Sequence, residues 1–215
     1  MTGCYVNLVS LSPCPVTVPD VSKYIALEGG DGSGKTTVAD ALTSRLRTRG
    51  DDVVLVREPG GTPLGEVVRE LLLDSEALDD WAEAFLFAAQ RAELARRVVA
   101  PALSEGKWVI SDRTYYSSIA YQGRARGLGE EAVREINEVG LGGVLPDHVF
   151  VLDVSPSTAL PRQHRPDRIG AEGEQFQEEV RKAYLALADT DEKVVVLDGS
   201  LPVEALVDEI LEVTG

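Results

Sequence analysis

The feature that most constrains the fold of this chain is a glycine-rich stretch, Gly29-Gly30-Asp31-Gly32-Ser33-Gly34-Lys35-Thr36-Thr37. It fits the pattern G-x-x-x-x-G-K-[ST], which carries weight only between a strand and a helix. Both neighbours have the required character. Residues 23–28 are a short, mostly apolar run, and residues 35–49 have helical periodicity and end before Gly50. The sequence therefore predicts a P-loop, with residues 29–37 binding the phosphates of ATP.

The chemistry of this loop follows from its residue types. Glycines let successive backbone N–H groups turn inward around an anion, and the following helix adds its dipole. We expect Lys35 to reach the β- and γ-phosphates and the Thr36 hydroxyl to ligand Mg²⁺. A P-loop alone does not separate a kinase from a switch or a motor.

Strand and helix patterns alternate along the chain. Short runs rich in β-branched residues predict strands at 23–28, 53–57, 107–111, 148–153 and 193–198. Helical periodicity predicts helices at 35–49, 81–105, 174–189 and 203–213. This alternation predicts an α/β, three-layer P-loop NTPase fold with a five-stranded parallel sheet flanked by helices. Ligands of such sheets bind beyond the carboxyl ends of the strands.

Length and composition limit the remaining possibilities. The 215 residues suit one domain at 23–215, preceded by an extension at 1–22 without signal-peptide features. The only cysteines, Cys4 and Cys14, lie in that extension and give no metal-ligand spacing. A formal charge of −15 argues against nucleic-acid and anionic-membrane partners, and no apolar run is long enough for a membrane helix. We expect a cytoplasmic enzyme.

Two strand ends supply arginines beside the P-loop. Arg57 ends the second predicted strand and is followed by Glu58 and Pro59 in a stiff turn; Asp112 and Arg113 follow the third. Paired guanidinium groups suit bidentate capture of a second phosphate. We expect Asp112 to organise Mg²⁺ through water and Arg113 to act in catalysis.

Three longer motifs make the chain resemble bacterial thymidylate kinases. They are E-G-G-D-G-S-G-K-T-T at 28–37, R-E-P-G-G-T at 57–62, and D-R at 112–113 with S-S-I-A-Y-Q-G at 117–123. Their order and spacing match across about residues 23–213. The resemblance implies dTMP and ATP as substrates, Mg²⁺ as cofactor, and a homodimer packed through long helices.

The resemblance also implies how the acceptor base is bound. Phe87 and Arg91 lie four residues apart, so they share one face of the predicted helix at 81–105. By the resemblance, Phe87 stacks on thymine and Arg91 donates to a base carbonyl. Without the resemblance, ordinary core packing would be the better interpretation of Phe87.

The other acceptor contacts also rest on the resemblance. Tyr121 corresponds to the residue that crowds the 2′ position of the sugar, and Ser117, Ser118 and Gln122 are expected near the base and sugar. Asp31 corresponds to the acidic residue that holds the 3′-hydroxyl or a metal-bound water. Glu58 and Pro59 are expected to line the same side.

A group of arginines predicts a lid at about 157–173. Arg162, Arg165 and Arg168 lie close together in a chain that is otherwise poor in positive charge. Pro161, with Pro166 and Gly170, indicates a segment between helices rather than one long helix. An arginine-bearing lid would exclude water and neutralise charge on the transferring phosphoryl group. We expect Arg162 and Arg168 to carry the catalytic role.

The lid also departs from the family pattern. The family runs D-R-I-E where this chain has Asp167-Arg168-Ile169-Gly170, and Glu172 or Glu174 could replace the missing carboxylate.

Two other functions fit parts of the pattern. A kinase for another nucleotide, or for a nucleoside with Glu58 as the base, shares the P-loop. A P-loop switch or ATP-driven binding protein differs in needing no acceptor, and the guanine-reading N-K-x-D motif does not occur in this chain.

Overall fold

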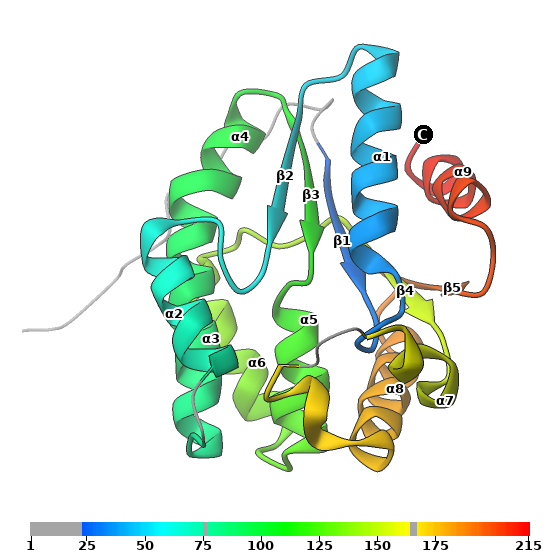
Figure 1. Ribbon diagram of the computed structural model, residues 1–215. Helices are drawn as coiled ribbons and strands as arrows, with labels where there is room; N and C mark the ends of the chain where they lie inside the picture. The colour runs from blue at the N-terminus through cyan, green and yellow to red at the C-terminus, as the bar shows by residue number, and fades with distance from the viewer. Residues whose placement is uncertain (1–22, 75–76, 164–166) are drawn as a thin grey trace, which may run out of the picture.

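Within the described residues, five strands form one parallel sheet in the order β2-β3-β1-β4-β5 (Figure 1). The computed structural model describes residues 23–74, 77–163 and 167–215. The strands are β1 (Tyr24–Glu28), β2 (Val53–Arg57), β3 (Trp108–Asp112), β4 (His148–Asp153) and β5 (Val194–Asp198). The prediction of an α/β fold with a five-stranded parallel sheet is confirmed.

Helices connect these strands. The longer ones are α1 (Lys35–Arg49), α2 (Pro63–Asp74), α3 (Asp80–Leu94), α6 (Glu130–Leu141), α8 (Glu174–Ala188) and α9 (Val203–Thr214). The shorter ones are α4 (Ala100–Ser104), α5 (Tyr115–Ser118) and α7 (Pro156–Ala159), the π-helical stretches η1 (Ala95–Val99) and η2 (Ile119–Ala125), and the 3₁₀ turns η3 (Leu160–Arg162) and η4 (Gly170–Glu172).

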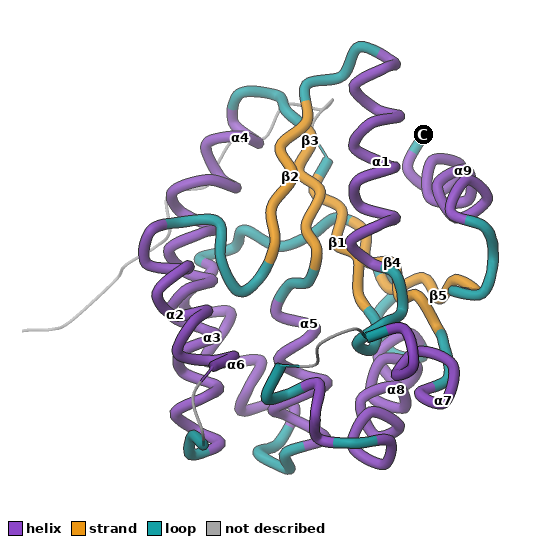
Figure 2. Tube along the Cα trace, in the orientation of Figure 1, coloured by secondary structure: helices purple, strands orange, loops and turns teal. Residues whose placement is uncertain are grey.

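Helices cover both faces of the sheet (Figure 2), and side chains that alternate along the strands pack against them. In β1, Ile25 and Leu27 pack with residues of α1 and α9, whereas Tyr24 and Ala26 face the opposite layer. There, α5, η2 and α8 cover one part of the sheet, and η1 and α4 cover another. A strand buried on both faces reads as a continuous apolar run, which is why these strands were recognisable in the sequence.

The register fixes which loops meet at the carboxyl edge of the sheet. Leu27 of β1 lies opposite Asp112 of β3, and Arg57 of β2 lies opposite the same aspartate. The residues after β1, β2 and β3 are therefore neighbours at one edge. These are the P-loop, the turn at 58–62 and the segment at 113–118.

Strand and helix boundaries differ from the sequence prediction at several points. Strands β1, β3 and β5 each begin one residue later than expected, and β3 extends to Asp112. The predicted helix at 81–105 is divided into α3, η1 and α4. Pro101 explains the division, because it lacks an N–H and its ring crowds the carbonyl four residues earlier, so the turn before it widens to a π-helix.

Helices α2 and α6 were not predicted. Part of the lid at 157–173 is described, as α7, η3 and η4, but Arg165 lies outside the described residues, as does the expected extension at 1–22. Among the described helices, none has the length and apolarity to cross a membrane.

Candidate active site

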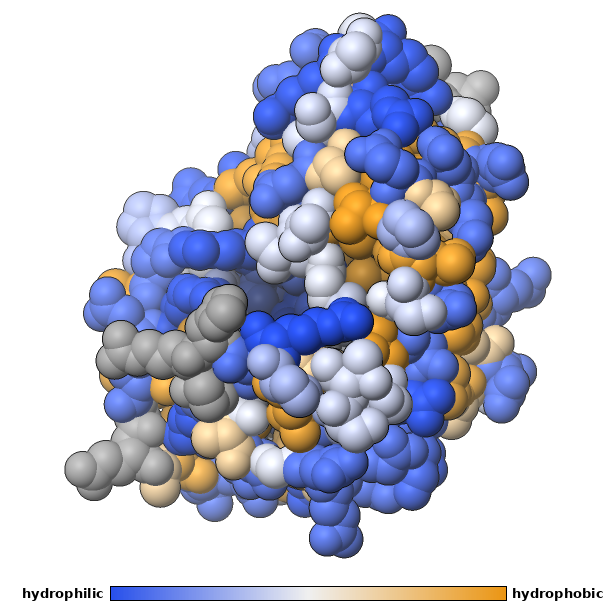
Figure 3. Space-filling model, turned by 45° about the vertical axis from the view of Figure 1, so that its right-hand side comes forward, coloured by the Kyte–Doolittle hydropathy of each residue, from blue (hydrophilic) through white to orange (hydrophobic). Residues whose placement is uncertain are grey.

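A cavity of about 1050 Å³ opens at the carboxyl edge of the sheet. One end is lined by the P-loop and by Gly199, Ser200 and Leu201, which follow β5; the other is lined by residues from the ends of β2 and β3 and from α3, α5 and η2. Figure 3 shows a hollow on this face with hydrophilic residues gathered around it. The cavity therefore joins the P-loop to the end at which the sequence predicts acceptor binding, called the acceptor end below.

The P-loop has the backbone geometry that its glycines allow. Gly32 and Gly34 both have positive φ, at 82° and 97°, and a Cβ at Gly32 would overlap the carbonyl oxygen of Ala159. Lys35 Nζ donates to the carbonyls of Gly29 and Gly30 at 3.1 and 2.8 Å. Burial and the nearby charge of Arg113 lower the pKa of Lys35 to about 8.

Two oxygen ligands suited to a hard cation meet beside this loop. Thr36 Oγ1 donates to Asp112 Oδ2 at 2.6 Å, and neither side chain is fully buried. Hydroxyl and carboxylate oxygens with room for water suit Mg²⁺, which keeps several of its own waters. The residues present therefore fit the implied ion. No group of three or more His, Cys, Asp or Glu side chains that could hold a metal occurs in residues 23–74, 77–163 and 167–215.

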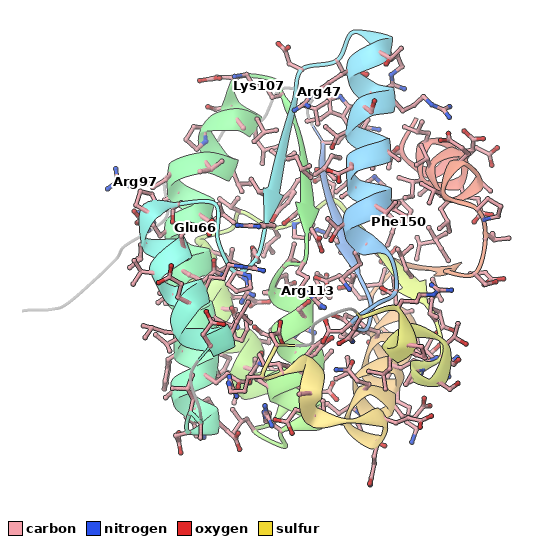
Figure 4. The ribbon with its side chains drawn as sticks, in the orientation of Figure 1. Arg47, Glu66, Arg97, Lys107, Arg113 and Phe150 are labelled. Carbon is pink, nitrogen blue, oxygen red and sulfur yellow. The ribbon has the colours of Figure 1, made fainter. Side chains whose placement is uncertain are left out.

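Arg113 joins the P-loop to the acceptor end. Its guanidinium forms an ion pair with Asp31 and donates to Gly29 O, Ser117 Oγ and Tyr121 OH at 3.1–3.3 Å. Figure 4 shows Arg113 below the end of β3, near the middle of the molecule. Burial alone would raise the pKa of Asp31, but the charges of Arg113 and Lys35 outweigh it and hold that pKa below its usual value. Arg113 also has φ of 74°, which is unusual for a residue with a side chain.

A second arginine lies at the end of β2. Arg57 Nη2 lies 3.1 Å from Glu66 Oε2 of α2, and both side chains are about half exposed. Glu66 also accepts from the backbone N–H of Gly61, which lowers its pKa. Arg69, one turn further along α2, donates to the carbonyl of Pro59 and lines the cavity.

Arg91 lies behind the acceptor end. Its side chain is 2% exposed and it is not among the residues that line the cavity. The guanidinium pairs with Glu58, donates to Ser118 Oγ at 3.1 Å and bonds Asn137 Oδ1 of α6. Burial raises the pKa of Glu58, although Arg91 opposes that shift. In this conformation Arg91 reaches the cavity through Glu58 and Ser118, both of which line it.

The remaining acceptor residues from the sequence gather around the same space. Phe87, Ser118, Tyr121 and Gln122 all line the cavity, as do Pro59 and Ser117. Phe87 is partly buried against the core and also contributes to the cavity wall. Gln122 Nε2 donates to the buried carboxylate of Glu83 at 2.7 Å.

The two chosen lid arginines occupy different places. Arg162 is exposed and lines the cavity. Arg168 donates to the carbonyl of Leu72 at the end of α2 and pairs with Glu83 at 2.6 Å. Glu172, one of the two possible substitutes for the missing family carboxylate, pairs with Arg126 at 2.6 Å.

Several residues that shape the site were missed in the sequence. Three are buried polar side chains on helices, Glu83, Asn137 and Gln177. Two on α2, Glu66 and Arg69, bond the backbone of the turn after β2. Asn137 could have been found, because it interrupts an apolar face that Val133 and Leu141 form at four-residue spacing. Gln177 donates to Asp31 from α8, and no local pattern signals that contact.

Comparison with known proteins places the whole described core in one family. A family model described as thymidylate kinase matches residues 27–210. The chain is 43% identical over 193 residues to the thymidylate kinase of Fervidobacterium nodosum, which covers 88% of this chain and 97% of that protein. It is 40% identical to the enzyme of Finegoldia magna over 195 residues (88% and 96%) and 42% identical to that of Latilactobacillus sakei over 202 residues (90% and 94%).

The buried Arg91–Glu58 pair predicts an unusually large stability effect. Replacing Arg91→Met leaves a buried carboxylate without its cation, so we expect the free energy of unfolding to fall by about 3–5 kcal/mol at pH 7. Urea denaturation followed by circular dichroism measures this change. The loss should shrink toward pH 5, because Glu58 has a raised pKa and the variant can then fold with it neutral.

Arg45→Ala is the matched control for this measurement. Arg45 pairs with Glu204 at the surface, with side chains 44% and 74% exposed, so its loss should lower the free energy of unfolding far less than the loss of Arg91 does. Equal losses in the two variants would contradict the prediction.

Proposed function

The chain belongs to the thymidylate kinase family, and we propose that it transfers the γ-phosphoryl group of ATP to dTMP, giving ADP and dTDP. The observation that carries this proposal is the single cavity in which the P-loop faces Arg57, Arg113 and Phe87. A nucleotide-dependent transferase needs both substrates in one space from which water can be excluded. The proposal includes a cytoplasmic location, by likeness to the family.

The acceptor phosphate is proposed to bind between Arg57 and Arg113. Each guanidinium now contacts a carboxylate, Glu66 or Asp31, that a phosphate dianion can replace or share. Phe87 is proposed to stack on thymine, with Ser118 and Gln122 near the base and sugar. Arg91 would then act on the base directly after a side-chain movement, or through Ser118.

The sugar is proposed to lie near the P-loop. Tyr121 contacts the Arg113 guanidinium, with the ring centroid 5.1 Å from it, and so limits space beside the acceptor. Asp31, held near Arg113, is proposed to accept from the 3′-hydroxyl.

Mg²⁺ is proposed to bind at Thr36 and, through water, at Asp112. When bound, the ion would neutralise charge on the β- and γ-phosphates. Lys35 would release its present carbonyl partners to reach the same phosphates, which requires little more than rotation of a flexible side chain.

No strong general base is needed for this reaction, because the acceptor is already a phosphate anion. Glu58, the base that a nucleoside kinase would require, is buried and paired with Arg91. That pairing favours a monophosphate acceptor over a nucleoside.

A comparison of several possible phosphate acceptors tests the proposed function. We expect MgATP-dependent ADP release, in a coupled assay, to be strong with dTMP, weaker with dUMP and near background with dCMP, dAMP, dGMP and thymidine. EDTA should abolish it. Leading activity with thymidine or a purine monophosphate would overturn the acceptor assignment, and ADP release without acceptor would favour a switch.

The two lid arginines are proposed to act at different places. Arg162 lines the cavity and would approach the transferring phosphoryl group, whereas Arg168, paired with Glu83, would hold the root of the lid on the acceptor side. Both roles serve catalysis.

Separate substitutions distinguish these roles. Arg162→Ala should lower kcat by about 10³-fold with little change in KM for dTMP, because a transition-state arginine is lost. Arg168→Ala should lower the thermal midpoint and raise KM for dTMP, because the buried Glu83 loses its nearer cation and keeps only Arg126, at 3.5 Å. Steady-state kinetics with thermal denaturation measure both. A larger kcat loss in a stable Arg168→Ala protein would reverse the assignment.

The chain is also proposed to form a homodimer through the outer face of α2, α3 and α6. These helices pack side by side (Figure 1), and they expose large apolar side chains: Leu64 and Val67 on α2, Trp81 and Phe85 on α3, and Val139 on α6. Val139 is 83% exposed and Val67 is 57% exposed. Such a patch on helices is typical of an interface between copies.

A charge placed on this face should separate the copies. The native chain should show about twice its 23.1 kDa mass by light scattering after size exclusion, and Phe85→Glu should shift it to the monomer mass. Val213→Glu on α9, where the native side chain is 47% exposed, is the control and should leave the mass unchanged. A monomeric native protein would refute the interface.

A further inference from the structure

Glu28 is a buried carboxylate at the end of β1 for which the proposed reaction has no direct use. Its side chain is fully buried, and it immediately precedes the P-loop. Among the described residues, four donors surround it. Oε1 accepts from Thr114 N and Thr114 Oγ1, each at 2.7 Å, and Oε2 accepts from Ser117 Oγ at 2.6 Å and Tyr184 OH at 2.8 Å.

Three of these donors belong to the segment that follows Arg113. Thr114 is the next residue, and Ser117 lies in the first turn of α5. Arg113 itself has positive φ, and its backbone is held from both sides: its N–H donates to Leu27 O at 3.0 Å and its carbonyl accepts from Ser111 Oγ at 2.5 Å. Glu28 therefore fixes the chain at the point where it leaves an unfavourable backbone conformation.

The Thr114 hydroxyl bonds Glu28 and does not cap α5. Thr114 occupies the N-cap position of α5, where a threonine hydroxyl usually accepts from a backbone N–H of the first turn. Here no such bond forms, and the hydroxyl donates to Glu28 instead. The hydroxyl therefore ties the start of α5 to Glu28 and makes no capping bond to the helix.

Ser117 links Glu28 to the guanidinium. The Ser117 hydroxyl donates its one hydrogen bond to Glu28. Its lone pairs are therefore available to accept from Arg113 Nη1, at 3.1 Å. Tyr184 OH lies 2.9 Å from the same hydroxyl and also donates to Glu28. A carboxylate only accepts, so Glu28 sets the direction of the bonds that it receives from Thr114, Ser117 and Tyr184.

Building on the proposed function, we infer that Glu28 is a positioning residue for phosphoryl transfer: it orients Arg113 toward the acceptor phosphate through Thr114 and Ser117. It acts through these residues and does not touch either substrate. An amide at this position would keep the size but present N–H groups to donors, so Thr114 and Ser117 would have to turn away.

Glu28→Gln tests the inference. We expect kcat/KM for dTMP to fall by about 10- to 100-fold, because small displacement of a phosphate-binding guanidinium is costly. KM for ATP should stay within about threefold, since the P-loop keeps its contacts. A role in stability alone would lower the thermal midpoint and leave the kinetic constants of the folded protein unchanged, and that result would overturn the inference.

Two further variants sharpen the test. Tyr184→Phe removes one donor to Glu28 but leaves the Ser117–Arg113 contact, so kcat/KM for dTMP should change by less than about threefold. Ser117→Ala removes the link itself and should lower the same constant. Its effect should not add to that of Glu28→Gln, because both act on Arg113. Full additivity would contradict the inference, and an unchanged Ser117→Ala enzyme would contradict it even if Glu28→Gln failed to fold.

Failure of the proposed function is distinguishable from failure of this inference. The native protein alone decides the function, by ADP release with dTMP. Calorimetric binding of dTMP needs no turnover. Weaker dTMP binding by Glu28→Gln than by the native chain would support the inference in either case, and equal binding and equal kinetics would refute it.

Discussion

The ion pair between Arg113 and Asp31 is the interaction on which the rest of the site depends. It joins the segment after β3 to the P-loop after β1, two neighbouring strands whose register sets Leu27 opposite Asp112. Because the sheet is parallel and buried on both faces, neither strand can slip without exposing its core residues. The positions of the two loops are thus set by hydrophobic packing, and the charges are added to a frame that is already rigid.

Four arginines of the site each contact a carboxylate, in a protein of net charge −15. Arg57, Arg91, Arg113 and Arg168 contact Glu66, Glu58, Asp31 and Glu83 respectively. Two of these arginines, Arg57 and Arg113, themselves line the cavity, where we propose that a phosphate competes for the cation. The other two are anchored by carboxylates that are almost fully buried. Ion pairs between arginine and carboxylate therefore hold cations both on the wall of the cavity and behind it.

The sequence was most informative where function depends on local backbone geometry. The P-loop, the strand ends at Arg57 and Asp112, and the cluster around Tyr121 could be located because each follows a recognisable apolar strand or belongs to a specific motif. Asn137, Glu83 and Gln177 act on the site from distant helices, and tertiary packing alone brings them near. The division of the predicted helix at 81–105 was open to prediction, because Pro101 within it is a sequence signal for a helix break.

The space around Gly32 limits which residues this position can hold. The carbonyl of Ala159, at the end of α7, occupies the space that any side chain at position 32 would need. Backbone atoms cannot be repacked as side chains can, so a larger residue there would have to move α7 and the segment that follows it. The backbone at the end of α7 therefore restricts position 32 to glycine. A substitution at position 32 is compatible only with a different position of α7, so the P-loop and α7 constrain each other's sequence.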